Sequence, residues 1–393
     1  MAKKPNIRFA GFEDDWEQRK VSELCSISTG KSNTQDKSED GEYPFYVRSP
    51  IIERSTKYLY DEEAVITVGD GVGTGKVFHY VNGKYDLHQR CYRMYGFSDE
   101  LNAHYFYHTF SKLFYKRVMA MTAKTSVDSV RLEMIADMEI PTPTIEEQIK
   151  IGTYFDHLDH LITLHQRKCD ELKKVKKFML QKMFPKKGEK NPEIRFDGFT
   201  NDWEQRKLGE IAIEILAGGD IDKEKVVDDG AYPIYANALT NDGIVGYYND
   251  YYRVKAPAVT VTGRGEVGHA QARMTDFTPV VRLLAIRSSN DCYFLENAIN
   301  NHKVVVESTG VPQLTVPQLS SYDICFPKDI EEEKKIGAYY KKLDRLITLH
   351  QCKCKSCKKY YKCTRKLKCW YLIEEKFIFV IINIRVTDNK FYL

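Results

Sequence analysis

The sequence predicts an α/β (α+β) protein made of two similar strand-rich domains, each followed by a long helix. The stretch Asp159–Gln166 returns, with one substitution, at Asp344–Gln351. Two openings also match, because residues 7–20 and 194–207 share Ile-Arg-Phe, Gly-Phe and Asp-Trp-Glu-Gln-Arg-Lys. Between the repeats lie β-branched and aromatic runs bounded by Gly, Asn and Asp, which are typical of strands. The chain is therefore one unit written twice, with an internal pseudo-twofold repeat.

These repeats also suggest where the segments of the chain begin and end. A chain of 393 residues can form two domains, each with a core of its own. A polar stretch between two prolines, Pro185–Pro192, ends the first long helix. The predicted segments are a first domain at 1–144, its helix at 145–185, a linker at 186–193, a second domain at 194–329, its helix at 330–369, and an atypical tail at 370–393.

Composition indicates a cytoplasmic protein without a membrane partner. The 59 basic and 55 acidic residues give a net charge of +4, too mild to indicate a nucleic-acid partner by itself. The N-terminus lacks the apolar core of a signal peptide. The longest apolar run, Phe377–Ile382, is too short to span a bilayer. Five of the ten cysteines are scattered and suggest no disulfide framework, as in a reducing compartment.

The first domain contains three clear strand patterns and one helical pattern. Strands are predicted at Tyr43–Val47, Ala64–Val68 and Lys76–Val81. The dipeptide Asn82-Gly83 predicts a hairpin turn directly after the third strand. Aromatic residues at helical spacing predict a helix over 101–120.

The second domain repeats the anchors of the first but not its loops. Tyr232–Tyr235 matches Tyr43–Tyr46, and Ala258–Thr262 matches Ala64–Val68. Between these anchors the two domains share little sequence. This contrast indicates two modules on one scaffold with different binding specificities.

Each long helix carries a coiled-coil seam. Thr144 and Glu147 predict a capping box at the start of the first helix. Apolar or neutral residues then alternate in steps of four and three, which is the spacing of a coiled coil. A helix this long needs a partner for its seam, and the second copy is the nearest candidate. The seam residues are Ile151, Phe155, Leu158, Ile162, His165 and Leu172 on the first helix, and Ile336, Tyr340, Leu343, Ile347 and His350 on the second.

Two glycine-rich stretches resemble nucleotide-binding loops without meeting their requirements. In Gly69–Lys76, Asp70 occupies a required glycine position of the phosphate loop, and Val77 replaces the required Ser or Thr. Gly263–Gly268 has the dinucleotide spacing, but a strand-like stretch at 277–281 follows where a helix should begin. We therefore predict glycine-rich turns between strands, where a backbone can approach a ligand closely.

Catalytic and metal-binding arrangements are not predicted. The chain lacks a nucleophile elbow, a metalloprotease His-Glu pair and the Asn/Asp-Pro-Pro-aromatic motif of amino-methyltransferases. Three histidines of the first helix keep one histidine counterpart in the second, which favours solvated helix faces over a metal site. The pairs are His157 with Lys342, His160 with Arg345, and His165 with His350. The sequence thus predicts a binding protein without catalytic residues.

Taken together, these motifs closely resemble the specificity (S) subunit of type I restriction–modification systems. The resemblance rests on the two openings, on the helix starts Pro143–Gly152 and Ile330–Gly337, and on the repeated Leu-Ile-Thr-Leu-His-Gln, and it extends from residue 1 to about 351. It implies two target-recognition domains, each followed by a conserved helix, with the helices packed as an antiparallel coiled coil. Each domain would read one half of a split, asymmetric site on double-stranded DNA.

The resemblance also implies partners. Methylation (M) and restriction (R) subunits would supply the chemistry, using S-adenosylmethionine, ATP and Mg²⁺, while this chain binds no cofactor. Two alternatives stay open: an autonomous enzyme, and a non-catalytic coiled-coil adaptor whose two β-rich domains bind protein or carbohydrate.

Candidate DNA contacts are polar and basic residues beside the glycine turns. Arg264 is the strongest, since an arginine on a glycine-flanked turn can bind guanine with two hydrogen bonds. Each candidate has the alternative of being a solvated surface residue. The candidates are Lys31, Arg48, Lys76, Arg90 and Lys124 in the first domain, and Tyr235, Asn237, Arg264, His269 and Gln313 in the second.

The end of the chain departs from this pattern. After Gln351, the segment Cys352–Cys357 stands where the first helix has Arg167–Leu172, and residues 377–384 predict a strand. The cysteine spacing fits no standard zinc motif. We hypothesise that the tail is out of frame or degenerate, which would weaken the distal seam, promote aggregation and impair the assembled complex.

Overall fold

The computed structural model describes residues 8–71, 73–121, 129–238, 240–302 and 313–366. The chain forms two compact units. The first comprises residues 1–164 together with the end of the chain from residue 353, and the second comprises residues 165–352. Each unit thus holds one strand-rich domain and a part of both long helices.

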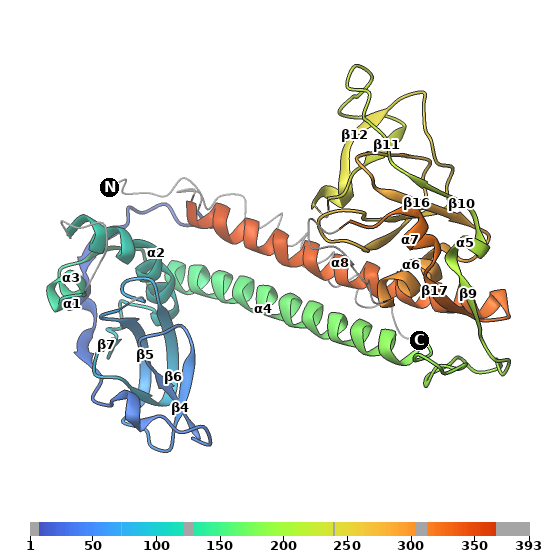
Figure 1. Ribbon diagram of the computed structural model, residues 1–393. Helices are drawn as coiled ribbons and strands as arrows, with labels where there is room; N and C mark the ends of the chain where they lie inside the picture. Colours follow the sequence, from blue (N-terminus) through green and yellow to red (C-terminus); the bar gives the residue numbers. More distant parts are fainter. Residues whose placement is uncertain (1–7, 72, 122–128, 239, 303–312, 367–393) are drawn as a thin grey trace. The chain divides into compact units, whose positions relative to one another are not determined.

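The first unit is built on a six-stranded sheet with the order β2-β7-β5-β6-β3-β4 (Figure 1). Neighbouring strands are antiparallel except β3 and β6, which run parallel. A separate pair, β1 with β8, brings the start of the domain to its end. The strands are β1 (Glu17–Lys20), β2 (Ser26–Thr29), β3 (Tyr43–Tyr46), β4 (Ile52–Ser55), β5 (Tyr60–Val68), β6 (Phe78–Leu87), β7 (Cys91–Tyr95) and β8 (Glu139–Thr142).

The hairpin turn predicted at Asn82-Gly83 is wrong. Strand β6 runs straight through both residues, which pair with Glu63 and Glu62 of β5. Gly83 has φ +119°, a conformation that glycine adopts without steric cost. The chain reverses instead between the end of β5 at Val68 and the start of β6 at Phe78. Strand pairing over the whole length of β5 outweighs the local turn preference of two residues.

A helix-rich layer covers one face of this sheet. Helix α2 carries Phe106, Phe110 and Phe114 at a spacing of four, and all three are fully buried. They form one core with Val65 of β5 and Met94 of β7. The helical elements before the long helix are α1 (Val21–Leu24), η1 (Thr34–Asp36), α2 (Ala103–Met121) and α3 (Leu132–Ala136).

The second unit follows a similar order of elements, with its 3-10 helix after β11 rather than before β3, and with two short strands, β14 and β15, where the first unit has the long strand β6. Its sheets have the orders β10-β16-β13-β14, β12-β11-β15 and β17-β9, and β11 pairs with β15 in parallel, as β3 does with β6. The elements are β9 (Glu204–Lys207), α5 (Leu208–Ile211), β10 (Ala212–Ala217), β11 (Tyr232–Tyr235), η2 (Thr240–Gly243), β12 (Ile244–Tyr248), β13 (Ala258–Val261), β14 (Ala270–Arg273), β15 (Thr278–Pro279), β16 (Leu284–Ser288), α6 (Cys292–Asn301), α7 (Val316–Ser320) and β17 (Asp323–Phe326).

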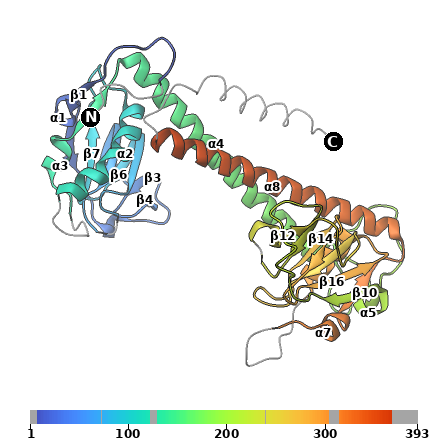
Figure 2. The ribbon, with the colours of Figure 1, turned by 90° about the horizontal axis from the view of Figure 1, so that it is seen from above.

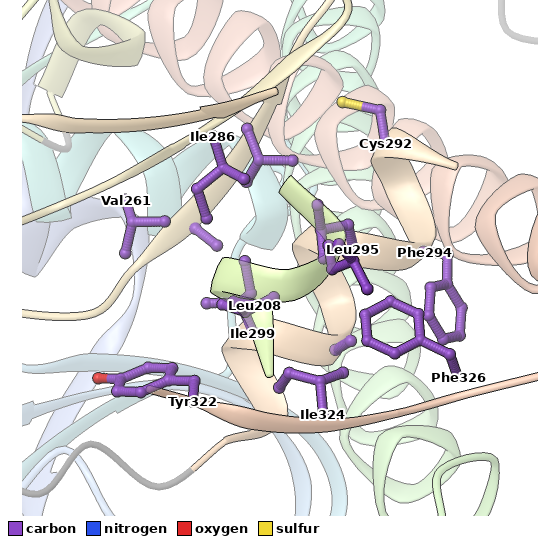
Figure 3. Close-up of a cluster of buried hydrophobic side chains, with 14 of the residues drawn as sticks. Leu208, Val261, Ile286, Cys292, Phe294, Leu295, Ile299, Tyr322, Ile324 and Phe326 are labelled. Carbon is purple, nitrogen blue, oxygen red and sulfur yellow. The ribbon is translucent and has the colours of Figure 1, made fainter. Parts of the chain in front are cut away.

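The core of the second unit lies between its sheet and helix α6. Figure 3 shows Leu295 and Ile299 of α6 on the side of Val261 and Ile286 of the sheet, while Phe294 lies beside Phe326; all of these side chains are almost completely buried. This arrangement repeats that of α2 on its sheet. The fold class predicted from the sequence, two similar strand-rich domains with two long helices, is confirmed.

Two long helices complete the fold: α4 (Ile145–Lys182) and α8 (Ile330–Lys366). In the second unit they lie side by side and run antiparallel (Figures 1 and 2). Lys176 Nζ lies 2.7 Å from both carboxylate oxygens of Asp344. Between the helices, His165 Nδ1 lies 3.0 Å from His350 Nδ1. In the first unit the Phe155 and Tyr361 rings meet at 5.4 Å between centroids.

Most of the predicted seam residues are buried. Ile162, Leu172 and His350 are half-buried. The buried ones are Ile151, Phe155, Leu158, His165, Ile336, Tyr340, Leu343 and Ile347. Helix α8 continues past Gln351, and Cys354 and Cys357 are also buried. The predicted strand at 377–384 lies outside the described residues. Within the ranges given above, no helix is long and apolar enough to cross a membrane.

The predicted capping box at Thr144 and Glu147 gives way to a long-range contact. The Glu147 carboxylate is fully buried and accepts hydrogen bonds from Arg8 Nε and Nη2, each at 2.7 Å, and from Trp16 Nε1 at 3.1 Å. Arg195 and Trp203 bind Glu332 of α8 in the same way. In each unit, the segment that opens the domain is thus tied to the first turn of the helix that closes it.

Candidate nucleic-acid interface

In the first domain, four residues from distant parts of the chain meet at one edge of the sheet. Arg48 follows β3, Asp70 follows β5, and Arg90 precedes β7. Ser129 forms a β-bridge with Asp70. We call these four residues the first-domain cluster.

The backbone of Gly69 holds this cluster together. Its N–H donates to the Arg90 carbonyl at 2.8 Å, and its own carbonyl accepts from Val130 N–H at 2.6 Å. A Cβ atom at this position would lie 2.6 Å from the Arg90 carbonyl oxygen, so only glycine fits. Gly69 thus lies in a turn between strands, as predicted, and its close backbone approach is to the two neighbouring loops of the chain itself.

Asp70 lies between two arginines. Its Oδ1 is 3.5 Å from Arg48 Nη1, and its Oδ2 is 3.7 Å from Arg90 Nε. The side chains of Arg48 and Arg90 are 49% and 64% exposed, against 24% for Asp70. At these distances the carboxylate orients both guanidinium groups while leaving most of their N–H donors free for another acceptor.

His88 lies beneath this cluster. Its side chain is buried, and its Nδ1 accepts from the Arg90 backbone N–H at 3.1 Å. Burial lowers the pKa of His88, and the charges of Arg48 and Arg90 lower it further. The imidazole is therefore neutral at pH 7 and adds no charge to this edge.

The second domain forms the matching cluster from Asn237, Arg264, Arg282 and Gln313, which we call the second-domain cluster. Gln313 Oε1 accepts from Arg282 Nη1 at 2.9 Å and from Arg264 Nη2 at 3.3 Å. Arg264 and Arg282 are exposed. Asn237 Oδ1 accepts from the Gly263 N–H at 2.8 Å, so Asn237 braces the glycine turn.

Backbone contacts in the second domain reproduce those around Gly69. The Gly263 carbonyl accepts from Leu314 N–H at 2.9 Å. A Cβ atom at Gly263 would lie 2.5 Å from the Arg282 carbonyl oxygen. Val281 and Arg282 have φ of +51° and +62°, a conformation that is unfavourable for non-glycine residues and often marks a functional site.

Strand pairing makes the two clusters equivalent position by position. Thr67 pairs with Tyr92 as Val261 pairs with Leu284. The parallel strands agree, because Tyr46 pairs with Leu87 as Tyr235 pairs with Pro279. The equivalent positions are Arg48 with Asn237, Asp70 with Arg264, Arg90 with Arg282, and Ser129 with Gln313.

Several candidates from the sequence lie at this edge, and others do not. Arg48, Arg90, Asn237, Arg264 and Gln313 are members of the clusters. Asp70, Arg282 and Ser129 were missed, because their proximity depends on which loops meet in space. Arg282 did carry one sequence signal: like Arg90, it is a basic residue just before a strand, with one residue between it and β16.

The remaining first-domain candidates lie away from the cluster contacts. Lys31 is exposed, directly after the close-packed Gly30, and its backbone N–H donates to the Leu87 carbonyl at 3.1 Å. Lys76 Nζ lies 5.1 Å from the centre of the Tyr115 ring. Lys124 lies outside the described residues.

Two second-domain candidates differ in exposure. Tyr235 is 7% exposed and packs against Phe277, with the Arg273 guanidinium 3.7 Å from the centre of its ring. Its side chain thus belongs to the core, because the inward face of β11 is buried. His269 is exposed at the base of the β13–β14 hairpin, where its N–H donates to Thr262 Oγ1 at 2.9 Å.

The two domains thus hold equivalent loops in the same arrangement but carry different side chains on them. This is the pattern of a duplicated recognition protein. The family model of the type I restriction modification DNA specificity domain matches residues 13–174 and again residues 200–356. The chain therefore belongs to the type I specificity-subunit family, a class of DNA-recognition subunits, and carries two copies of its domain.

Similar proteins agree with this assignment. A putative type I specificity subunit from Mycoplasma pneumoniae is 24% identical over 332 residues, which cover 81% of this chain and 86% of the relative. The specificity subunit of the type I restriction enzyme MjaVIII from Methanocaldococcus jannaschii is 25% identical, over about half of each chain. The crystal structure of the S subunit from M. genitalium aligns with a TM-score of 0.72 at 14% identity, covering 92% of this chain and 98% of that one, which supports the fold.

Proposed function

We propose that this protein reads a split, asymmetric site on double-stranded DNA and directs methylation and restriction subunits to that site. The observation that carries the proposal is the pair of equivalent clusters. Each gathers two arginines around a glycine turn, and exposed basic groups of this kind favour binding to the DNA backbone and bases. Three of the four equivalent positions carry different side chains, so the two domains present different groups to DNA.

The charges of the clusters support an asymmetric site. The first-domain cluster holds two arginines and one aspartate, for a net charge of +1. The second-domain cluster holds two arginines and two neutral amides, for a net charge of +2. Because base edges are distinguished by donors and acceptors, unlike side chains favour unlike half-sites.

The chemistry would come from the partner subunits, with S-adenosylmethionine, ATP and Mg²⁺, and this chain would bind none of these. Burial raises the pKa of the Cys25, Cys91 and Cys292 thiols to about 12. Protonated, buried thiols are poor nucleophiles. We expect the purified chain alone to turn over no S-adenosylmethionine, and turnover by this chain would favour an autonomous enzyme instead.

Exchanging one recognition domain tests the proposal. Residues 1–144 would be replaced by the first domain of another specificity subunit, and the methylated motif would be determined by methylome sequencing of a host with all subunits. We expect one half of the motif to change and the other half to stay. A change in both halves, or no split motif with the original chain, would contradict the proposal.

A further inference from the structure

We propose a division of labour within each cluster, which rests on the proposed function. Arg48 in the first domain and Arg264 in the second read guanine edges in the major groove. Arg90 and Arg282 contact phosphates, whatever the sequence of the half-site. Asp70 and Gln313 are positioning residues that hold each arginine pair in place.

The assignment of Arg90 and Arg282 follows from the duplication. Arg90 and Arg282 occupy equivalent positions of the two clusters. At the other three equivalent positions the two domains carry different residues. A side chain kept at two differing half-sites must contact something that both half-sites offer. The phosphate backbone is common to all sequences, and contacts to it set register without reading bases.

The assignment of Arg48 and Arg264 follows from the positions that differ. Besides the shared arginine, each domain has one more. In the first domain this is Arg48, which follows β3, and in the second domain it is Arg264, which follows β13. These two positions lie on different loops of the same frame, so the guanines they read stand at different places in the two half-sites. Arginine binds the O6 and N7 of guanine with two hydrogen bonds, the commonest specific contact to a base.

One acceptor in each cluster serves both arginines. The Asp70 carboxylate pairs with Arg48 and Arg90, and the Gln313 side-chain oxygen accepts hydrogen bonds from Arg264 and Arg282. Holding a flexible arginine in its binding geometry lowers the entropy lost when it meets DNA. The contacts of 2.9–3.7 Å leave other N–H groups of each guanidinium available. The glycine-centred backbone contacts fix the loops on which these side chains stand.

Alanine variants of the four arginines test the division. Each variant would be assembled with its methylation subunits, and binding would be measured on the wild-type motif, on single-base variants of that motif and on unrelated duplex. R264A should lose about 5- to 140-fold discrimination at one guanine of the second half-site, the range for one bidentate base contact. R48A should do the same in the first half-site.

R90A and R282A should behave differently. Each should weaken binding to all duplexes by a similar factor, and should lower the slope of log affinity against log salt by about one. The methylated motif should stay unchanged. Each domain serves as the matched control for the other, because a variant in one domain should leave the other half of the motif intact.

The positioning role needs a readout that misfolding would not mimic. Q313A should reduce discrimination at the guanine assigned to Arg264, with an unchanged melting temperature. Q313E keeps an acceptor oxygen, as Asp70 does, and should restore discrimination while its negative charge lowers affinity for every duplex. Equal discrimination by Q313A and the original protein would refute the role of Gln313.

The outcomes separate this inference from the proposed function. If the original complex binds and methylates no split motif, the proposed function fails. If it does so, but R264A keeps its motif while R282A changes it, the division of labour is wrong and the proposed function stands.

Discussion

At the scale of single residues, buried charges fasten each domain to its helix. Glu147 and Arg8 are 0% and 9% exposed, and their pairing is bidentate. Because both groups are largely excluded from water, removal of Glu147 leaves Arg8 with only its hydrogen bond to the Asp14 carbonyl, and removal of Arg8 leaves a buried carboxylate without a cation.

We expect Glu147→Ala to lower the free energy of unfolding of the first unit by about 3–5 kcal/mol. The loss comes from an unpaired Arg8 and an unbonded Trp16 N–H. Glu146→Ala changes an exposed neighbour on the same turn and should cost little. Urea unfolding monitored by tryptophan fluorescence measures both variants, and equal midpoints would contradict the prediction.

A second group of charged residues, on α2 and α4, makes the stability of the first unit depend on pH. Asp156 of α4 lies 2.6 Å from His104 Nδ1 and 3.0 Å from His108 Nε2. The hydrogen bond to Asp156 raises the pKa of His104 above its ordinary value. Burial alone would raise the pKa of Asp156, but hydrogen bonds with both histidines lower it well below its ordinary range.

The pH dependence follows from these directions. The contribution of protonated His104 is complete below about pH 6.5 and is lost as the pH rises through its raised folded pKa. We expect His104→Gln to flatten the stability curve above about pH 6.5, removing at most about 1 kcal/mol because the pair is partly exposed. His157→Gln, an exposed site on the same helix as Asp156, should keep the original slope. Unfolding titrations at several pH values measure this, and parallel curves for all three proteins would rule it out.

Five of the eight cluster residues were candidates from the sequence, and their contact with DNA stays a prediction. Arg48, Arg90 and Arg264 were found because they are basic residues near glycine turns. Asp70 and Arg282 were missed because which loops meet depends on strand order. Asn82-Gly83 shows the converse, where a local signal lost to the pairing of a long strand.

At the scale of elements, the repeat predicted both long helices, because a four-and-three spacing sustained over many turns is specific to paired helices. Helix α8 carries its contacts beyond the point where the sequence begins to diverge. Cys354 and Cys357 are buried, and Tyr361 packs on Phe155. The hypothesis of a degenerate tail therefore applies to two features: the smaller side chains along this stretch, such as Cys357 in place of a leucine, and the residues beyond 366.

The tail hypothesis predicts a gain from repair. Replacing residues 352–393 with a copy of Arg167–Phe184 puts Leu back at the position of the buried Cys357. We expect higher solubility and a higher fraction of methylated sites in the host, since filling such a position favours packing. A control copy with Cys retained at that position should recover less. Full methylation with the original tail would refute the hypothesis.

At the scale of the whole molecule, the duplicated order of elements was readable, because two anchor motifs per domain recur in the same sequence order. The distance between the two half-sites could not be predicted from the sequence, and it requires an experiment. We propose that the paired helices set the distance between half-sites.

Matched insertions of four residues, after Gln166 and after Gln351, lengthen each helix by about 6 Å. Inserting four residues in both helices keeps the seam residues of one helix opposite those of the other. We expect the spacer of the methylated motif to grow by about two base pairs, at about 3.4 Å each, while both half-site sequences stay the same. Insertion in one helix alone should impair assembly. An unchanged spacer in the double variant would refute the role of the helices.

The backbone contacts at Gly69 and Gly263 have a consequence for how such a protein evolves. Gly69 binds Arg90 and Val130 through backbone atoms, and the Gly263 carbonyl binds the Leu314 N–H, so these contacts persist when neighbouring side chains change. Under the proposed function, substitutions at cluster positions other than Asn237 therefore change what a domain binds while these backbone contacts stay in place. If each domain reads one half-site as proposed, a gene with two such domains can change each half separately, by point substitution or by exchange of one domain.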